Sequence, residues 1–220
     1  EFAYKTFDKK DLPTKEIALF TKVMPNSSHF ARKLLETFQE TIRNNNINLS
    51  IYILTDYDLQ NLILPANFRY DTTIGIICVE LFDKKYSKLL TNQNLPTLFI
   101  DSFVEEDNEL LADKLYMENY NSVYKMVKQF INRGYKNIIF VGDINHCQSF
   151  NERYKGYLKA ISEFNLNHNI EFCITENDDI FGVELITQKV KILKKLPNVF
   201  VCANDFIAID VIKSLKSLNY

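Results

Sequence analysis

Short apolar runs of strand length alternate along this chain with segments whose apolar residues recur at helical spacing. In the first half these runs are IALFTKVM (17–24), LSIYIL (49–54), TIGIICV (73–79) and TLFI (97–100). Strands that are separated by helices pair in parallel through right-handed crossovers. The alternation therefore predicts an α/β fold built on parallel sheets.

The pattern pauses after Asp101 and then restarts, which predicts a second α/β unit. An edge strand is expected within LADKLYM (111–117), and Gly134 suits the left-handed residue that closes a helix. The stretch 55–72 contains Pro65 and little helical signal, so a short or irregular crossover is expected there. In the second unit we expect helices at 121–133, 151–164, 182–195 and 206–217, and strands at 137–142, 170–174 and 199–203.

Composition bounds the class of protein. With 220 residues, of which 46% are hydrophobic, the chain can bury one sizeable core or two small ones. A formal net charge of −2 gives no general attraction to nucleic acid. The chain starts without a leader-like pattern and has no uninterrupted apolar stretch of about 18 residues. We therefore expect a cytoplasmic protein without a membrane partner.

Motifs for catalysis, cofactors and metals are absent from the sequence. It has neither GxGxxG nor GxxxxGK[ST] to cradle a phosphate, and no GxSxG turn for a nucleophilic serine. The four cysteines form no CxxC pair. His146 and Cys147 are too close in sequence to chelate one ion readily, and His146 with Ser149 is a weak nucleophile–base pair. We expect no enzyme, no cofactor and no metal.

Polar residues follow most of the predicted strands. Thr55-Asp56, Glu80 and Asp101 do so in the first unit, and Gly142 to Ser149, Thr175 to Asp178 and Asn204-Asp205 in the second. In α/β sheets the carboxyl ends of the strands are where ligands bind. If the two sheets face each other by these edges, the polar residues converge on one cleft that suits a small ligand.

Four stretches in order resemble the effector-binding domain of LacI/GalR-type bacterial transcription regulators. They are LPTLFID (95–101), YMENYNSVYKMVKQFINRGYKNIIFVGD (116–143), SFNERYKGYLKAISEFNL (149–166) and VFVCANDFIAID (199–210). The R-x-x-G-Y-x-x-A stretch from Arg153 to Ala160, combined with the AND stretch, is the most specific part. Sugar-binding proteins of the periplasm share this fold, so the resemblance fixes architecture better than biology.

The resemblance implies two doubly wound parallel-sheet subdomains of the periplasmic binding protein-like type I, truncated at the C-terminus. It places a linker remnant at 1–16, an N-terminal effector-binding subdomain at 17–117 and an incomplete C-terminal one at 118–220. It also implies roles for individual residues, since relatives bind sugar hydroxyls with an acidic residue after the fourth strand, an arginine and an asparagine. The implied ligand-binding residues are His29, Phe30, Asp56, Asp101, Ser149, Arg153 and Asn204.

Structural roles compete with these assignments. Asn204 can cap the following helix, and Asp101 can cap the following loop. Arg153 can pair on the surface with Glu152 or Glu163, and Phe30 can belong to the core. As a ligand-binding residue, Arg153 is expected to pack weakly and to add little to stability.

The sequence thus predicts the ligand-sensing domain of a LacI-family repressor that responds to a sugar or glycoside. Its expected partners are a small-molecule effector, a second copy in a homodimer, and operator DNA through a helix-turn-helix headpiece that this chain lacks. The alternative is a sugar-binding protein of an ABC-type transporter.

Overall fold

The computed structural model describes residues 15–23, 31–105, 110–176 and 181–220, without the side chains of residues 31 and 32. Two compact units divide the chain. The first holds the described residues up to Ser102 and residues 110–115, and the second holds Phe103–Glu105 and Tyr116–Tyr220. The domain boundary expected between residues 117 and 118 stays a prediction. Within the described residues no helix is long and apolar enough to cross a membrane.

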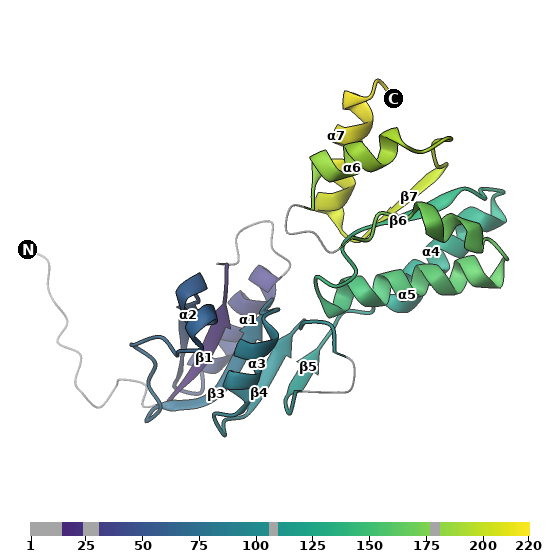
Figure 1. Ribbon diagram of the computed structural model, residues 1–220. Helices are drawn as coiled ribbons and strands as arrows, with labels where there is room; N and C mark the ends of the chain where they lie inside the picture. Colours follow the sequence, from purple (N-terminus) through teal and green to yellow (C-terminus); the bar gives the residue numbers. More distant parts are fainter. Residues whose placement is uncertain (1–14, 24–30, 106–109, 177–180) are drawn as a thin grey trace, which may run out of the picture. The chain divides into compact units, whose positions relative to one another are not determined.

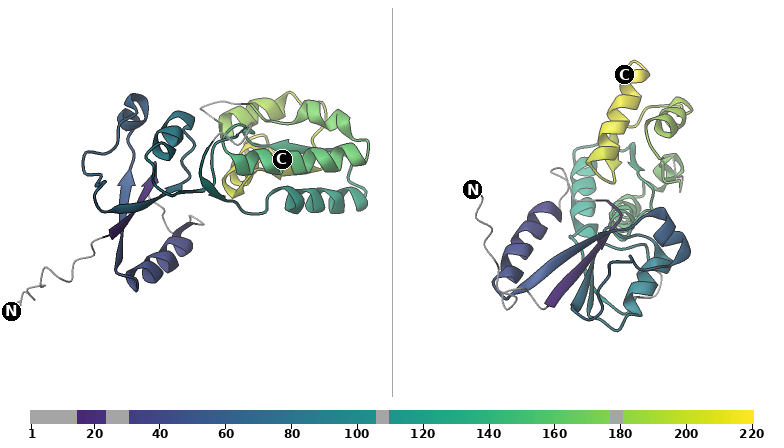
Figure 2. Two further views of the ribbon diagram at one scale, coloured as in Figure 1. Left: turned by 90° about the horizontal axis from the view of Figure 1, so that it is seen from below. Right: turned by 90° about the vertical axis from the view of Figure 1, so that its left-hand side faces the viewer.

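The first unit is built on a five-stranded parallel sheet of order β2-β1-β3-β4-β5. Figure 2 shows α1 on one face of this sheet and α2 and α3 on the other, which makes the unit doubly wound. In chain order its elements are β1 (Lys15–Thr21), α1 (Ala31–Arg43), β2 (Ile47–Ile53), α2 (Asp56–Asn61), β3 (Thr73–Val79), α3 (Lys84–Thr91), β4 (Thr97–Ile100) and β5 (Asp113–Leu115).

Both faces of this sheet are apolar because both are covered by helices. Leu19, Ile77, Val79 and Ile100 form a buried cluster on one face, against which Leu35 and Phe38 of α1 pack. The residues that alternate with them, such as Phe20, Cys78 and Phe99, are fully buried as well. Continuous apolar runs such as TIGIICV are therefore strands buried on both sides.

The second unit has a smaller sheet, in which β6 and β7 pair in parallel. Helices α4 and α5 lie together on one side of it and α6 and α7 on the other (Figure 1). Its core joins Val127, Tyr157 and Ile161 to residues of α6 and α7 around the strands. The elements are α4 (Tyr120–Asn132), β6 (Ile138–Val141), α5 (Gln148–Glu163), η2 (Asn167–Phe172), α6 (Val183–Lys191), β7 (Val199–Cys202) and α7 (Asp205–Ser217).

The prediction of a strand at residues 170–174 is wrong. Residues 167–172 form the 3-10 helix η2, and only Ile174 pairs with β6, through a single isolated bridge. The Asn169 side chain donates to the Lys136 carbonyl at 2.8 Å, and the Phe140 N–H donates to Cys173 Sγ at 3.3 Å. Together with the backbone pairing of Ile174, these contacts hold the segment against the sheet without a ladder. Ile170 and Ile174 pack against the core, whereas Phe172 between them is exposed.

Most other elements lie close to their predicted positions. The strands at 73–79 and 97–100 have the predicted bounds, and β5 is an edge strand as expected. Helix α5 begins at Gln148, three residues before its predicted start, and α6 ends at Lys191 instead of residue 195. Helix α3, which was not predicted from the sequence, forms the crossover between β3 and β4.

Candidate functional site

A polar cluster lies where β6 and β7 end in the second unit. Gly142 follows β6 with a φ of 154°, and a Cβ atom there would come within 2.4 Å of the Ala203 Cβ. The residue after β6 therefore has to be glycine for the two strand ends to come this close. Ala203 is buried and Asn204, next to it, begins α7.

Arg153 extends from α5 into this cluster. Its Nε donates to Asn119 Oδ1 at 3.0 Å, and its Nη1 donates to the Ala203 carbonyl oxygen. The guanidinium carbon lies 5.8 Å from the centre of the Phe150 ring, a cation–π distance. Among the described residues, Nη2 has no hydrogen-bond partner, so part of the fork can still donate.

Asn119, which accepts from Arg153 Nε, is itself held in place by hydrogen bonds. It is 3% exposed, and its amide nitrogen donates to the Met117 carbonyl at 2.9 Å and to Glu152 Oε2 at 3.2 Å. Gln148 Nε2 donates to Glu152 Oε1 at 3.2 Å. A close helix crossing brings these groups together, because a Cβ on Gly156 would lie 2.2 Å from the Tyr120 carbonyl oxygen.

The surface ion pairs considered for Arg153 involve carboxylates that bind elsewhere. Glu152 accepts from Asn119 and Gln148, and Glu163 binds Lys128 at 2.9 Å and the Tyr124 hydroxyl at 2.7 Å. These contacts lower the pKa of Glu163, the Tyr124 hydrogen bond most. The expectation that Arg153 packs weakly is wrong, because its fork holds a buried amide and a backbone carbonyl.

Asn204 is the N-cap of α7. Its Oδ1 accepts the Ile207 N–H at 2.9 Å, in extended backbone geometry typical of a cap. Its amide nitrogen has no partner within the part of the chain that the structure describes, and the residue is partly exposed. The capping role is thus observed, and a donor remains for a ligand. Ser149 lies buried in the first turn of α5.

Two predicted ligand-binding residues of the first unit, Asp101 and Asp56, follow strands at the carboxyl edge of its sheet. Asp101 directly follows β4 with a left-handed φ of 60°, and its Oδ1 accepts the Ser102 N–H at 2.9 Å. Glu80, after the neighbouring β3, is also left-handed with a φ of 48°. Such backbone outliers concentrate at functional sites. Asp56, in the first turn of α2, pairs with Lys22 at 3.0 Å on the exposed surface.

His29 and Phe30 lie outside the described residues. The structure brings Arg153 close to the residue that precedes Asn204, and it adds Asn119, Gln148 and Glu152 to the cluster. None of these three residues was predicted to bind the ligand, although Glu152 was considered as a surface partner of Arg153. Asn119 stands 34 residues before Arg153, so no short-range spacing could have indicated the contact.

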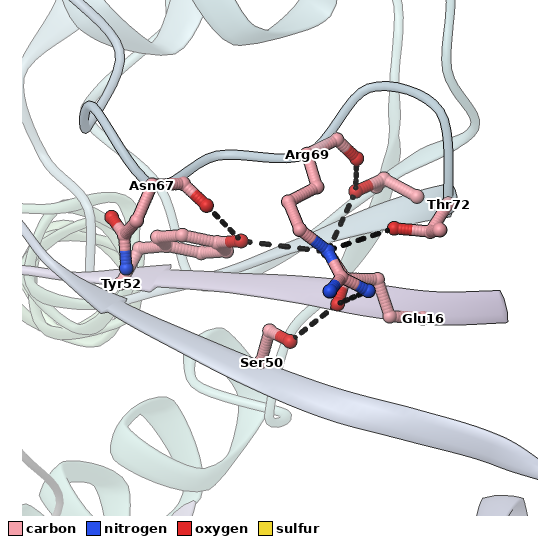
Figure 3. Close-up of polar contacts among 7 residues, drawn as sticks. Glu16, Ser50, Tyr52, Asn67, Arg69 and Thr72 are labelled. Atoms are coloured by element: carbon pink, nitrogen blue, oxygen red, sulfur yellow. Dashed lines mark hydrogen bonds and ion pairs between the residues drawn. The ribbon is translucent and has the colours of Figure 1, made fainter. Parts of the chain in front are cut away.

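A second polar cluster surrounds Glu16 at the start of β1 (Figure 3). The Glu16 side chain is 4% exposed, and Ser50 Oγ donates to its Oε2 at 2.7 Å. The hydroxyls of Thr73 and Tyr52 lie 3.2 Å and 3.5 Å from Oε1, and Arg69 Nη2 lies 3.4 Å from Oε2. Burial, and then the neighbouring Glu16 carboxylate, raise the pKa of Tyr52.

Three of the four cysteine thiols are poorly reactive. All four cysteines are free. Burial raises the pKa of Cys202 to about 11, and it also raises the pKa values of Cys78 and Cys173. A protonated thiol is a poor nucleophile and a poor metal ligand. Among the described residues, no three His, Cys, Asp or Glu side chains are grouped to hold a metal ion.

Comparison with known proteins gives concordant results. The model of a periplasmic binding protein-like domain matches residues 127–220. The chain is 32% identical over 96 residues to the NTD biosynthesis operon regulator NtdR of Bacillus subtilis (strain 168), covering 44% of this chain and 29% of NtdR. It is 27% identical over 160 residues to the HTH-type transcriptional repressor PurR of Histophilus somni (strain 129Pt), covering 70% of this chain and 45% of PurR.

A LacI-family regulatory protein from Chloroflexus aggregans has the same fold, with a TM-score of 0.71 and 15% identity over 92% of this chain and 73% of that one. The chain thus spans less than half the length of the two curated relatives. The predicted resemblance is confirmed, and these relatives are regulators. Residues 127–220 thus match a periplasmic binding protein-like domain, and the chain is similar in sequence to LacI-type regulators and has their fold.

Proposed function

We propose that this chain is the ligand-sensing domain of a LacI-type transcription repressor, and that its effector is a sugar or glycoside. The observation that carries the proposal is the Arg153 fork, fixed by Asn119 and the Ala203 carbonyl at the ends of β6 and β7. A guanidinium that keeps a free N–H suits the paired oxygens of a sugar.

The second unit supplies further groups of the right kind. Asn204, whose side-chain amide nitrogen can donate, is the residue after Ala203. Ser149 and Phe150 precede Arg153 by about one helical turn. An amide donates to sugar hydroxyls, and an aromatic face packs against the C–H face of a sugar ring. One structure with this fold is the CelR–cellobiose complex, with a TM-score of 0.71 and 12% identity. Cellobiose is therefore a reasonable first probe.

In the first unit we assign Asp101 and Asp56 to the same effector, with His29 and Phe30 as further contacts. Asp101 is mostly buried at the end of β4, where a carboxylate can accept from hydroxyl groups. Effector binding would favour one arrangement of the two units. Only a difference in affinity between the two states of a regulator can shift their equilibrium.

The regulator is further proposed to be a cytoplasmic homodimer that binds operator DNA through a helix-turn-helix headpiece outside this chain. The alternative, a sugar-binding protein of an ABC-type transporter, lacks support from the relatives described above, which are regulators. A mobility-shift assay on the full-length gene product distinguishes them, because only a regulator releases or binds a specific DNA fragment when sugar is added.

The test of the sensing role is calorimetric titration of this chain with cellobiose, in parallel with Arg153→Met and Lys155→Met. Lys155 is an exposed residue of the same helix and serves as the control. Loss of a charge-assisted hydrogen bond should weaken sugar binding by ten- to a hundredfold, about 1.5–3 kcal/mol. Equal sugar affinities for the two variants would remove Arg153 from the site.

A further inference from the structure

A cavity of about 370 Å³ opens at the amino ends of β6 and β7, the edge of the sheet opposite to Arg153. The segments before both strands, the helix η2 and the residues after α6 line it. Cavities of this size hold small organic ligands. None of the residues assigned to the effector lines it, so it is a separate candidate site.

The lining of the cavity is basic. Lys136, Lys194, Lys195 and His168 surround it, and no acidic residue is among its lining residues. Among the described residues, none of these three lysines has a salt bridge, whereas Lys189 nearby is paired with Glu176. Three ammonium groups without a salt bridge among the described residues thus border one cavity of a chain whose net charge is −2. They create a local field that favours an anion.

A buried polar group adds a second observation. Asn169 is 1% exposed and lines the cavity, and its Oδ1 has no hydrogen-bond partner within the described part of the chain. Buried acceptors without a partner are rare, and because phosphate oxygens are themselves acceptors, the donor that satisfies this one would be an ordered water beside the ligand. The Asn169 amide nitrogen is fixed by the Lys136 carbonyl, so the oxygen cannot be satisfied by turning the amide over without breaking that bond.

The cavity walls are also held in place. The Asn198 N–H donates to the Asn137 carbonyl at 2.7 Å, and Asn137 Nδ2 donates to the Leu196 carbonyl at 3.3 Å. These bonds fix the two segments that lead into β6 and β7. A binding surface that is already ordered loses less entropy when a ligand binds.

An apolar part of the ligand has a place as well. The Phe172 ring is 43% exposed and lines this cavity together with Leu193. Both residues also line a second cavity of about 260 Å³, so an apolar wall separates the two. A flat ring can lie on Phe172 while the anionic group lies among the lysines.

We propose that this cavity binds a small phosphate ester whose organic part is a flat or apolar ring. The lysines and His168 would bind the phosphate, and Phe172 the ring. Such a site would give the regulator a second input, independent of the sugar.

Phenyl phosphate, inorganic phosphate and phenol are suitable probes, titrated into this chain and followed by NMR chemical shifts. We expect phenyl phosphate to bind more tightly than either fragment, because it uses both halves of the cavity. Raising the salt concentration from about 50 to 500 mM should weaken phenyl phosphate but not phenol, because salt screens the lysines.

The variant Lys194→Gln/Lys195→Gln should weaken phenyl phosphate at least tenfold, and Phe172→Ala should reduce its advantage over inorganic phosphate. The matched control is Lys125→Gln/Lys216→Gln, which removes two exposed lysines elsewhere in the second unit. Melting of each variant verifies its fold. No saturable binding of phenyl phosphate, or equal losses in the test and control variants, would overturn the proposal.

Discussion

The Glu16 cluster of the first unit and the Arg153 cluster of the second are each centred on one charged side chain with several partners, and they differ in how much hydrogen-bonding capacity that side chain has left. Glu16 is 4% exposed in its side chain and is surrounded by three hydroxyls and Arg69. Arg153 is partly exposed, and among the described residues one of its terminal nitrogens is without a partner.

The two clusters also lie at opposite ends of the strands of their sheets. Glu16 lies near the amino end of β1, whereas Arg153 reaches the carboxyl ends of β6 and β7, the edge where α/β folds bind ligands. Removing a buried charge whose hydrogen-bonding capacity is filled should mainly cost stability, whereas a partly exposed charge with capacity remaining can also bind a ligand. The four predictions below test this distinction, from the largest expected effect to the smallest.

Replacing Glu16 with alanine should cost about 2–3 kcal/mol of folding free energy, because Ser50, Tyr52 and Thr73 lose an acceptor inside the unit. Arg69 is half exposed and contributes less, since water screens its pair with Glu16. Urea unfolding followed by circular dichroism measures the change, with the exposed Glu40→Ala as control. A loss below about 0.5 kcal/mol would mean that the cluster is not structural.

Gly156→Ala should destabilise the second unit by about 2–3 kcal/mol, because the added methyl would meet the Tyr120 backbone 2.2 Å away. It should also weaken sugar binding by moving Asn119 away from Arg153. The comparison variant is Gly134→Ala, where no atom lies within 4 Å and only the left-handed backbone costs about 1 kcal/mol. Equal losses of stability in both variants would show that the helix crossing adapts freely.

Arg153→Met should reduce stability by about 1–2 kcal/mol, since the buried Asn119 Oδ1 loses its donor. This loss is smaller than that of Glu16→Ala, whereas the loss of sugar affinity should follow the reverse order. Unfolding and titration on the same samples test both statements. If Glu16→Ala weakened sugar binding more than Arg153→Met, the distinction between the two clusters would fail.

Tyr52→Phe should lower stability by about 0.5–1 kcal/mol at neutral pH, because its hydroxyl makes only long contacts, 3.5 Å to Glu16 and 3.4 Å to Asn67. The folded-state pKa of Tyr52 is raised, so its contribution is complete below about pH 10 and is lost as the pH rises through the folded value. The stability difference between wild type and Tyr52→Phe should therefore shrink above pH 10. Urea midpoints at pH 8 and pH 10.5 measure it, and a constant difference would exclude a titrating Tyr52.

Local patterns in the sequence predicted the parts of the fold and the site that depend on neighbours along the chain. The period of the apolar residues indicates which faces are buried, so TIGIICV and TLFI were located with their observed bounds. The cap by Asn204 joins residues three apart, and a helix N-terminus requires such an acceptor whatever surrounds it.

By itself, then, the sequence determined an α/β chain with two sheets, polar residues at the strand ends and the helix cap at Asn204. Only the tertiary structure decided that 170–174 adds no strand, that Asn119 holds Arg153 across 34 residues, and that three lysines surround one cavity. Periodicity records whether a residue faces a core and not which distant group it meets there. Those contacts depend on close approaches such as Gly156 against Tyr120, which are set by how the elements pack against one another and not by the period of either helix.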